Sequence, residues 1–97
     1  MTKAVAIHLA TIEHIGVRLL VNDIPFKFRR LYDGAQLVFE WAENADVICH
    51  SDNYGHLEGF VESMGFPWDN GKVTCMIADD MADTIIHFYK EREKEQE

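Results

Sequence analysis

The hydrophobic period changes near residue 33, and this change constrains the fold of the chain more than any other feature. Over residues 15–21 every second side chain is apolar, and that alternation predicts a half-buried β-strand. Over residues 37–42 the apolar side chains fall instead at positions i, i+1, i+4 and i+5, which predicts one face of a helix. Strands and helices therefore share one chain without strict alternation, and we predict an α+β fold.

Cap and turn residues place the boundaries of the predicted elements. Asp33 suits a helix N-cap, and Gln36 completes a capping box three residues later. Asn70 and Gly71 suit a type I′ hairpin turn, because both central residues of that turn need positive φ. The predicted elements are strands over 4–10, 15–22 and 24–29, a helix over 33–43, a strand over 47–49, a helix over 57–64, a strand over 73–77 and a helix from Asp79 or Asp80 to residue 90. This order, βββ-α-β-α-β-α, predicts a mixed, mostly antiparallel sheet with the helices packed largely on one face.

The length of 97 residues corresponds to a single domain, which we place at residues 1–90. Residues 91–97 are entirely polar, and we expect them to form a charged, fraying C-terminal tail. A hydrophobic content of 47% is ample for a core, in which we expect Trp41 and Phe60.

Several features predict a cytoplasmic protein. No stretch approaches the roughly 20 apolar residues that a membrane helix needs, and no signal-peptide cleavage pattern follows the N-terminus. Cys49 and Cys75 are too few for a disulfide framework. We therefore expect two buried free thiols in a reducing compartment.

Cys49, His50 and His56 have the greatest potential for metal binding or catalysis. Zinc usually takes two closely spaced pairs of ligands, whereas Cys49 and His50 are adjacent and should point to opposite faces of a strand. There is no second ligand pair, no Pro-Cys-x-x-Cys of a zinc deaminase and no glycine-rich phosphate loop. We expect no metal, no cofactor and no enzymatic activity; a small enzyme or metal protein that uses these three residues is our third hypothesis.

Charge is distributed unevenly along the chain, whose net charge is −8. Residues 1–36 have a local charge of +2, and the alternation of Phe26 and Phe28 with Lys27 and Arg29 predicts a strand with a basic outer face. Residues 37–84, which we call the acidic segment, contain ten acidic residues against Lys72 alone, a local charge of −9. Such asymmetry favours a charged interaction surface.

The acidic segment provides our first hypothesis for function. Helix caps account for Asp79 and Asp80 but not for the other carboxylates. The expected binding residues are Glu40, Glu43, Asp46, Asp52, Glu58 and Glu62. Because an acidic surface repels nucleic acid and attracts basic protein grooves, we expect a protein partner with a basic, nucleic-acid-binding groove, and no direct contact with nucleic acid or membrane. By size and charge the chain resembles phage-encoded inhibitors, including nucleic-acid mimics that block restriction or CRISPR machinery.

The second hypothesis is a homodimeric interaction module that uses an apolar patch or a sheet edge. Aromatic residues in loops, such as Trp68, would then contribute more than charge. Salt dependence separates the two hypotheses, because charge-driven docking weakens as ionic strength rises.

Overall fold

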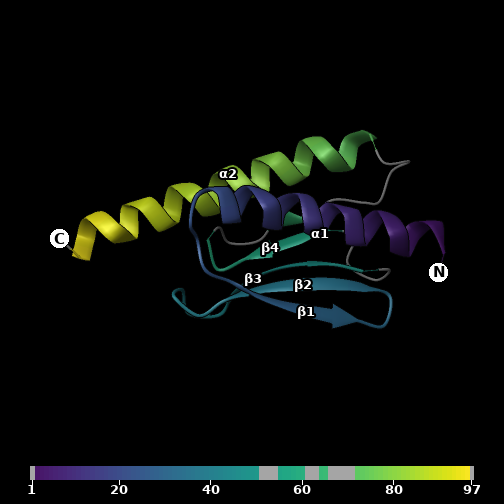
Figure 1. The fold of residues 1–97 in the computed structure, drawn as a ribbon, viewed down its shortest axis with the longest axis horizontal. Coiled ribbons are helices and arrows are strands. Elements are labelled where there is room, and N and C mark those ends of the chain that lie inside the picture. The colour runs from purple at the N-terminus through teal and green to yellow at the C-terminus, as the bar shows by residue number, and fades with distance from the viewer. Residues whose placement is uncertain (1, 51–54, 61–63, 66–71, 97) are drawn as a thin grey trace.

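The computed structural model describes residues 2–50, 55–60, 64–65 and 72–96 and places two helices on one face of an antiparallel sheet (Figure 1). The elements in chain order are α1 (Lys3–Val21), β1 (Lys27–Leu31), β2 (Gly34–Phe39), β3 (Ala45–Cys49), β4 (His56–Glu58), β5 (Met64–Gly65) and α2 (Lys72–Gln96). The sheet order is β1-β2-β3-β4-β5, and every described pairing is antiparallel. The predicted α+β class is confirmed, whereas the element order and the mixed sheet are not what the sequence predicted.

The first part of the chain forms a helix where we predicted two strands. The Thr2 hydroxyl caps α1, and Ile15 and Leu19 are fully buried on its inner face. These two residues are four apart, a spacing that fits a strand alternation and a helical face equally well. The other members of the alternation, Val17 and Val21, are exposed on α1. The predicted strands over 4–10 and 15–22 are therefore wrong.

The segment over 33–43 forms a strand and a turn rather than the predicted helix. Tyr32 and Asp33 are the two-residue turn between β1 and β2, so Asp33 is not a helix N-cap. In β2 the side chains of Leu37 and Phe39 are buried while Val38 between them is only half-buried. Here the period of two, rather than the i, i+4 spacing, reflects the structure.

The predicted strands over 24–29 and 47–49 correspond to β1 and β3. β1 is displaced by a few residues, but its alternation is as predicted. In the register with β2, Phe28 lies opposite the buried Leu37, whereas Lys27 lies opposite Val38 on the other face.

The last third of the chain departs most from the sequence prediction. The segment over 57–64, predicted as a helix, contains most of β4 and the start of β5, and the predicted strand over 73–77 lies within α2. The predicted helix from Asp79 or Asp80 to residue 90 is part of α2, which continues to Gln96 through most of the predicted tail. The Asn70-Gly71 turn lies outside the described residues.

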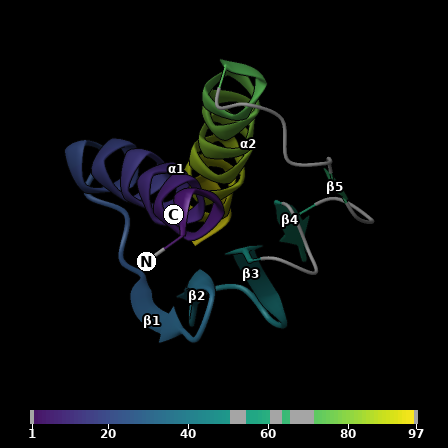
Figure 2. The same ribbon diagram turned by 90° about the vertical axis from the view of Figure 1, so that its right-hand side faces the viewer.

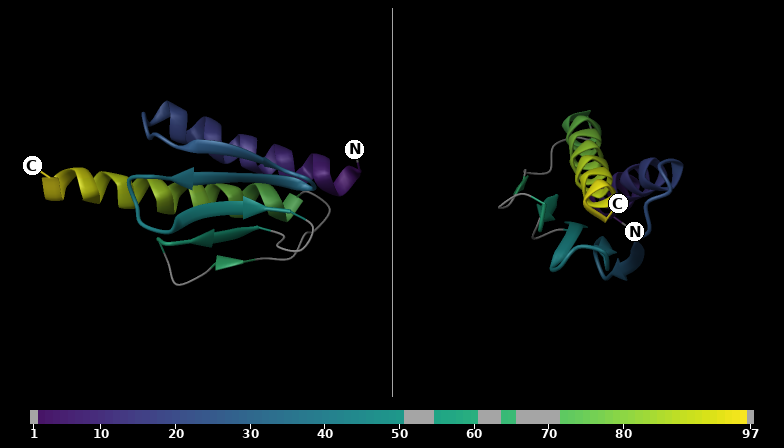
Figure 3. Two further views of the ribbon diagram at one scale, coloured as in Figure 1. Left: turned by 90° about the horizontal axis from the view of Figure 1, so that it is seen from below. Right: turned by 90° about the vertical axis from the view of Figure 1, so that its left-hand side faces the viewer.

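The core fills the space between the two helices and the inner face of the sheet (Figure 2). Viewed from below, the strands lie in front of both helices (Figure 3), and no described helix covers their outer face. Phe60 is buried in the core as predicted, whereas Trp41 is half-buried against it and donates a hydrogen bond to the Pro25 carbonyl at 2.9 Å. Among the described residues, neither helix is long and apolar enough to cross a membrane.

Candidate protein-binding site

The edge strand β1 is incompletely covered by the helices. Among the strands, α1 packs most closely against β2 and β3, whereas β1 is at the edge of the sheet and lies beneath α1 in the view of Figure 2. Phe28 points to the helix side of the sheet, as its register with Leu37 requires, yet its side chain is 57% exposed. An aromatic side chain on the inner side of the sheet is thus only partly covered by α1.

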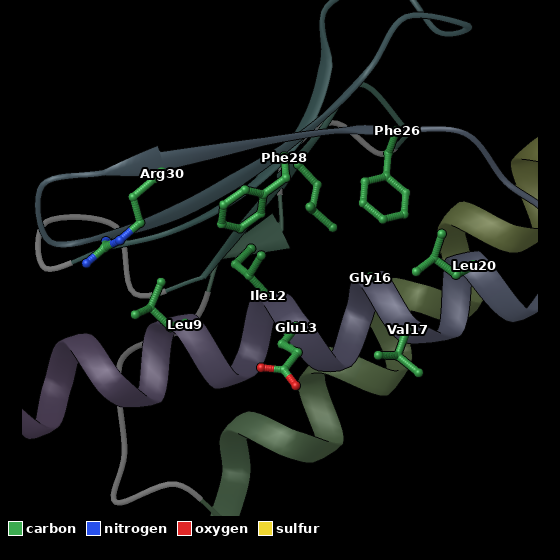
Figure 4. Close-up of a pocket in the computed structure, with 10 residues that line it drawn as sticks. Leu9, Ile12, Glu13, Gly16, Val17, Leu20, Phe26, Phe28 and Arg30 are labelled. Carbon is green, nitrogen blue, oxygen red and sulfur yellow. The ribbon is translucent and has the colours of Figure 1, made fainter.

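The space beside Phe28 is a groove of about 480 Å³ between α1 and β1 (Figure 4), which we call the α1–β1 groove. This volume falls within the range of ligand sites in proteins. Glu13 and Arg30 are the charged residues among its described lining. The apolar walls are formed chiefly by Leu9, Val17 and Leu20 of α1 and by Phe26, Phe28 and Leu37 on the strand side.

The α1–β1 groove is open, and its walls are apolar where they meet solvent. On α1, Val17 is 51% exposed and Leu20 is 64% exposed, and both line the groove. In Figure 4 Leu20 lies next to Phe26, whereas Phe28 lies over Ile12. Exposed apolar side chains that occur singly are ordinary, but a shared groove of them is typical of an interaction site.

One end of the α1–β1 groove is closed by the segment that joins α1 to β1 (Figure 4). Phe26 in this segment packs against Gly16 of α1, where a β-carbon would lie 3.4 Å from the ring Cζ atom. The close approach of the ring fixes the direction from which the chain enters β1.

Basic side chains follow β1 along the free edge of the sheet. Lys27, Arg29 and Arg30 are all exposed, and they are three of only nine lysines and arginines in the chain. Lys27 Nζ lies 2.6 Å from Glu40 Oε1, and this hydrogen bond raises the pKa of Lys27. The Arg30 guanidinium donates to the carbonyls of Leu31 and Gly34. Within the described part of the chain, the Arg29 guanidinium makes no ion pair or hydrogen bond.

Four of the six acidic residues singled out from the sequence lie within the described residues. Glu40 and Glu43 are exposed in the turn between β2 and β3, and Glu40 is paired with Lys27. Two other predicted binding residues, Asp52 and Glu62, lie outside the described residues.

Asp46 and Glu58 are direct neighbours across β3 and β4 on the open face of the sheet. Asp46 Oδ2 accepts a hydrogen bond from Gln36 Nε2 at 2.6 Å, whereas its buried Oδ1 has no hydrogen-bond partner in the described structure. Opposed like charges weaken a sheet, so this pair costs stability in the isolated chain.

Part of the negative charge is balanced by α1. Arg18 Nη2 lies 2.6 Å from Asp83 Oδ1, and His14 Nε2 lies 2.6 Å from Asp79 Oδ1. The hydrogen bond from His14, assisted by Arg18, holds the pKa of Asp79 below its ordinary value. Asp79 and Asp80 are thus interior residues of α2 rather than caps, and Asp79 and Asp83 help to join the helices.

A second cavity of about 350 Å³ lies between the β2–β3 turn and the C-terminal half of α2. Its lining combines the aromatic side chains of Trp41, Phe60 and Phe88 with three carboxylates, Glu43, Glu91 and Glu95, and it also includes His87 and Arg92. Phe60 links this cavity to the core, since its ring centroid lies 5.4 Å from that of Trp41 and 5.8 Å from that of Phe88.

Cys49, His50 and His56 are not gathered around one centre. The Cys49 thiol is free and fully buried in the core, and burial raises its pKa to about 12, so it is not a thiolate at neutral pH. His50 Nδ1 lies 3.8 Å from Asp33 Oδ1, and His56 lies opposite Ile48 on the other face of the sheet. The described ranges contain no group of three His, Cys, Asp or Glu residues that could hold a metal ion.

His8 is a buried ionisable residue whose environment the sequence did not reveal. It is 1% exposed on the inner side of α1, and its Nε2 has no hydrogen-bond partner in the described structure. Burial lowers the pKa of His8 although Asp33 acts in the opposite direction, and His50 lowers it further. The folded protein therefore favours neutral His8.

The buried His8 predicts that the protein is less stable at pH 5.5 than at pH 7.5. A histidine whose pKa is lowered by folding binds its proton more readily in the unfolded chain, so stability is lost as the pH falls below about 6.5. The free energy of unfolding, measured in urea at both pH values, should fall more for the parent than for His8→Leu. Equal losses in the two proteins would show that His8 does not cause the pH dependence.

The fold and the groove define a small α+β domain with an exposed apolar site beside a basic sheet edge. Comparison with known proteins gives no significant match to a family model, to a curated protein or to a solved structure.

Proposed function

We propose that this chain is a non-catalytic binding protein that takes a segment of a partner protein into the α1–β1 groove. The observation that carries the proposal is the more than half exposure of Leu20 and Phe28 on opposite walls of a groove of about 480 Å³. Neither side chain completes the core in this position, and both would be covered by a bound segment.

The exposed walls can supply useful binding energy. Fully burying one large apolar side chain contributes about 1.5–3 kcal/mol, and Val17, Leu20 and Phe28 each have about half of that still available. A dissociation constant of 1 μM corresponds to about 8 kcal/mol, so the apolar contacts need support from hydrogen bonds or charges. The free Cys49 thiol is typical of a reducing compartment, and we place the proposed function in the cytoplasm.

The proposed function predicts that one charge in the α1–β1 groove abolishes binding. Peptides selected from a displayed random library against the parent protein should bind Leu20→Asp at least tenfold more weakly, because the carboxylate would be desolvated beneath the ligand. Val21→Asp is the matched control, since Val21 is the next residue of α1 and is 77% exposed but does not line the groove. It should bind the same peptides within twofold. If the selected peptides bind Leu20→Asp as well as they bind the parent, the proposed site is wrong.

A second candidate function retains the acidic surface predicted from the sequence. The observation that favours it is the cavity in which Glu43, Glu91 and Glu95 surround Trp41 and Phe88, because aromatic faces and carboxylates both attract a lysine or arginine side chain. The partner would then be a protein with a basic, nucleic-acid-binding groove, as for a phage-encoded inhibitor. In the same selection, enrichment of basic peptides whose binding is lost with Glu43→Lys and at high salt would favour this candidate over the α1–β1 groove.

A further inference from the structure

We infer that the segment bound in the α1–β1 groove is an extended strand that pairs antiparallel with the free edge of β1, with apolar side chains towards α1 and acidic side chains towards the open face of the sheet. The inference rests on the proposed function and specifies the chemistry of its ligand. It is carried by three features of β1, namely its unpaired backbone, the exposed Phe28 on its inner side and its basic outer side.

The backbone of β1 has hydrogen-bonding groups on its free edge. β1 and β2 are joined by a two-residue turn, and Leu31 and Gly34 are the pair next to that turn. In such a hairpin the closing pair and every second pair beyond it exchange hydrogen bonds. The N–H and C=O groups of Phe28 and Arg30 therefore point away from β2, and no described strand pairs with them. Strand addition would satisfy them, as in known peptide-recognition domains.

The apolar side of the added strand would lie in the α1–β1 groove. A new strand is placed about 4.8 Å beyond β1, where the exposed side chains of α1 would cover its inner face. The residue opposite Phe28 would pack beside the Phe28 ring and against the apolar side chains of α1 that line the groove. Alternate residues of the ligand must therefore be apolar.

The other side of the added strand would face basic residues. Lys27 and Arg29 point to the open face of the sheet, as their pairing with Val38 and Gln36 shows. Lys27 already pairs with Glu40, but Arg29 has no recorded partner among the described residues. Opposite charges on directly facing strand residues attract one another, so the residue opposite Arg29 should be acidic.

A second copy of this chain is a poorer occupant than an acidic segment. In such a dimer, β1 of one copy would pair antiparallel with β1 of the second copy around a two-fold axis. Each residue would then lie opposite a residue of the second copy that points to the same face of the sheet. Pairing centred on Arg29 opposes the two Arg29 side chains, and pairing centred on Phe28 opposes Lys27 with Arg29. Such charged edges commonly prevent sheets from joining, and here they favour a ligand of opposite charge.

The length of the ligand strand is also limited by the fold. The segment carrying Phe26 closes the α1–β1 groove at one end (Figure 4), and β1 itself spans only Lys27–Leu31. Pairing over about five residues follows, and the recognised motif alternates acidic and apolar residues over that length.

The test uses a fluorescent eight-residue peptide in which valine and glutamate alternate, titrated against the whole chain. The peptide should bind the parent protein, and a block isomer with four consecutive valines and four consecutive glutamates should bind at least tenfold more weakly. In the antiparallel pairing the N–H groups of the valines face β1. N-methylation of the valines should therefore weaken binding at least tenfold, and N-methylation of the glutamates should change it less than twofold. Equal effects of the two N-methylated peptides would overturn strand addition.

A charge exchange tests the basic side of β1 independently. Arg29→Glu should bind the valine–glutamate peptide at least tenfold more weakly and should recover binding with a valine–lysine peptide. Lys90→Glu, a change at an exposed position of α2 outside the groove, is the control and should bind the first peptide within twofold. Failure of the valine–lysine peptide to bind Arg29→Glu would contradict the assigned pairing.

The two proposals fail in different ways. If library peptides lose binding with Leu20→Asp but are insensitive to Arg29→Glu and to alternate N-methylation, the groove binds a segment that is not an added strand, and only this inference is overturned. If no peptide depends on Leu20, the proposed function itself fails. Analytical ultracentrifugation tests for a second copy in the groove. If the parent is a dimer and Leu20→Asp is a monomer, a second copy is the occupant, and this inference is overturned.

Discussion

Replacing Gly34 with alanine is expected to leave the chain unfolded at temperatures at which the parent is folded. A β-carbon at this position would overlap the Cys49 carbonyl oxygen and would lie 2.8 Å from the His50 α-carbon. Both atoms belong to the backbone at the end of β3, which is held by its pairing with β2 and cannot rotate away as a side chain could. We expect a loss of about 3 kcal/mol or more, a large part of the roughly 5–15 kcal/mol that stabilises a typical domain. Thermal unfolding followed by circular dichroism measures the effect.

The same substitution at Gly16 is the matched control. Its β-carbon would meet only the Phe26 ring, at an ordinary contact distance of 3.4 Å, within a helix. Alanine is favoured over glycine in a helix by about 0.5–1 kcal/mol, so Gly16→Ala should melt at the parent temperature or slightly above it. Similar melting temperatures for Gly34→Ala and the parent would mean that β2 does not approach β3 as closely as described.

The sequence predicted correctly those elements whose pattern allows only one interpretation. Residues 26–29 alternate strictly between aromatic and basic side chains, and no helical face accommodates that order; they lie in and beside β1. The short apolar run over 47–49 is likewise part of β3. In residues 26–29 the side chains themselves distinguish the two faces of the sheet, whereas the run over 47–49 is apolar throughout and was predicted from its shortness.

The incorrect predictions share one physical cause. Residues four apart share a face in a strand and in a helix alike, so pairs such as Ile15 and Leu19 do not decide between them. The deciding residue between them is Val17, which is apolar although it lines an exposed groove rather than the core. The feature that suggests a function for the chain is therefore also the feature that concealed its first helix.

The charged residues of the site could be predicted only in part. The basic outer face of β1 follows from sequence alternation, but the incomplete cover of β1 by α1 depends on how the helix packs. The acidic segment was visible as a composition bias, whereas the pairing of Arg18 with Asp83 joins residues far apart in the chain. Adding up the formal charges of a sequence segment omits ion pairs with residues elsewhere in the chain. Such a sum therefore overstates how much unpaired negative charge the surface carries.

Truncation of Phe39 to alanine should be the most destabilising change among the side chains of the sheet. Phe39 is 2% exposed, and its ring centroid lies 5.3 Å from that of Phe60 and 5.6 Å from that of Trp41. Removing it leaves a cavity among rings that are themselves held by the core, at an expected cost of about 3–5 kcal/mol. Denaturant unfolding followed by tryptophan fluorescence measures that cost and reports on the environment of Trp41.

Phe28→Ala removes the same ring from the neighbouring strand and should have the opposite pattern of effects. Its side chain is 57% exposed on the wall of the α1–β1 groove, so the cost in folding stability should be only about 0.5 kcal/mol. Peptide binding should nevertheless fall at least tenfold, because the ligand loses the wall against which it packs. A stability loss as large as that of Phe39→Ala would show that Phe28 is part of the closed core. In that case there would be no open groove for a partner to enter.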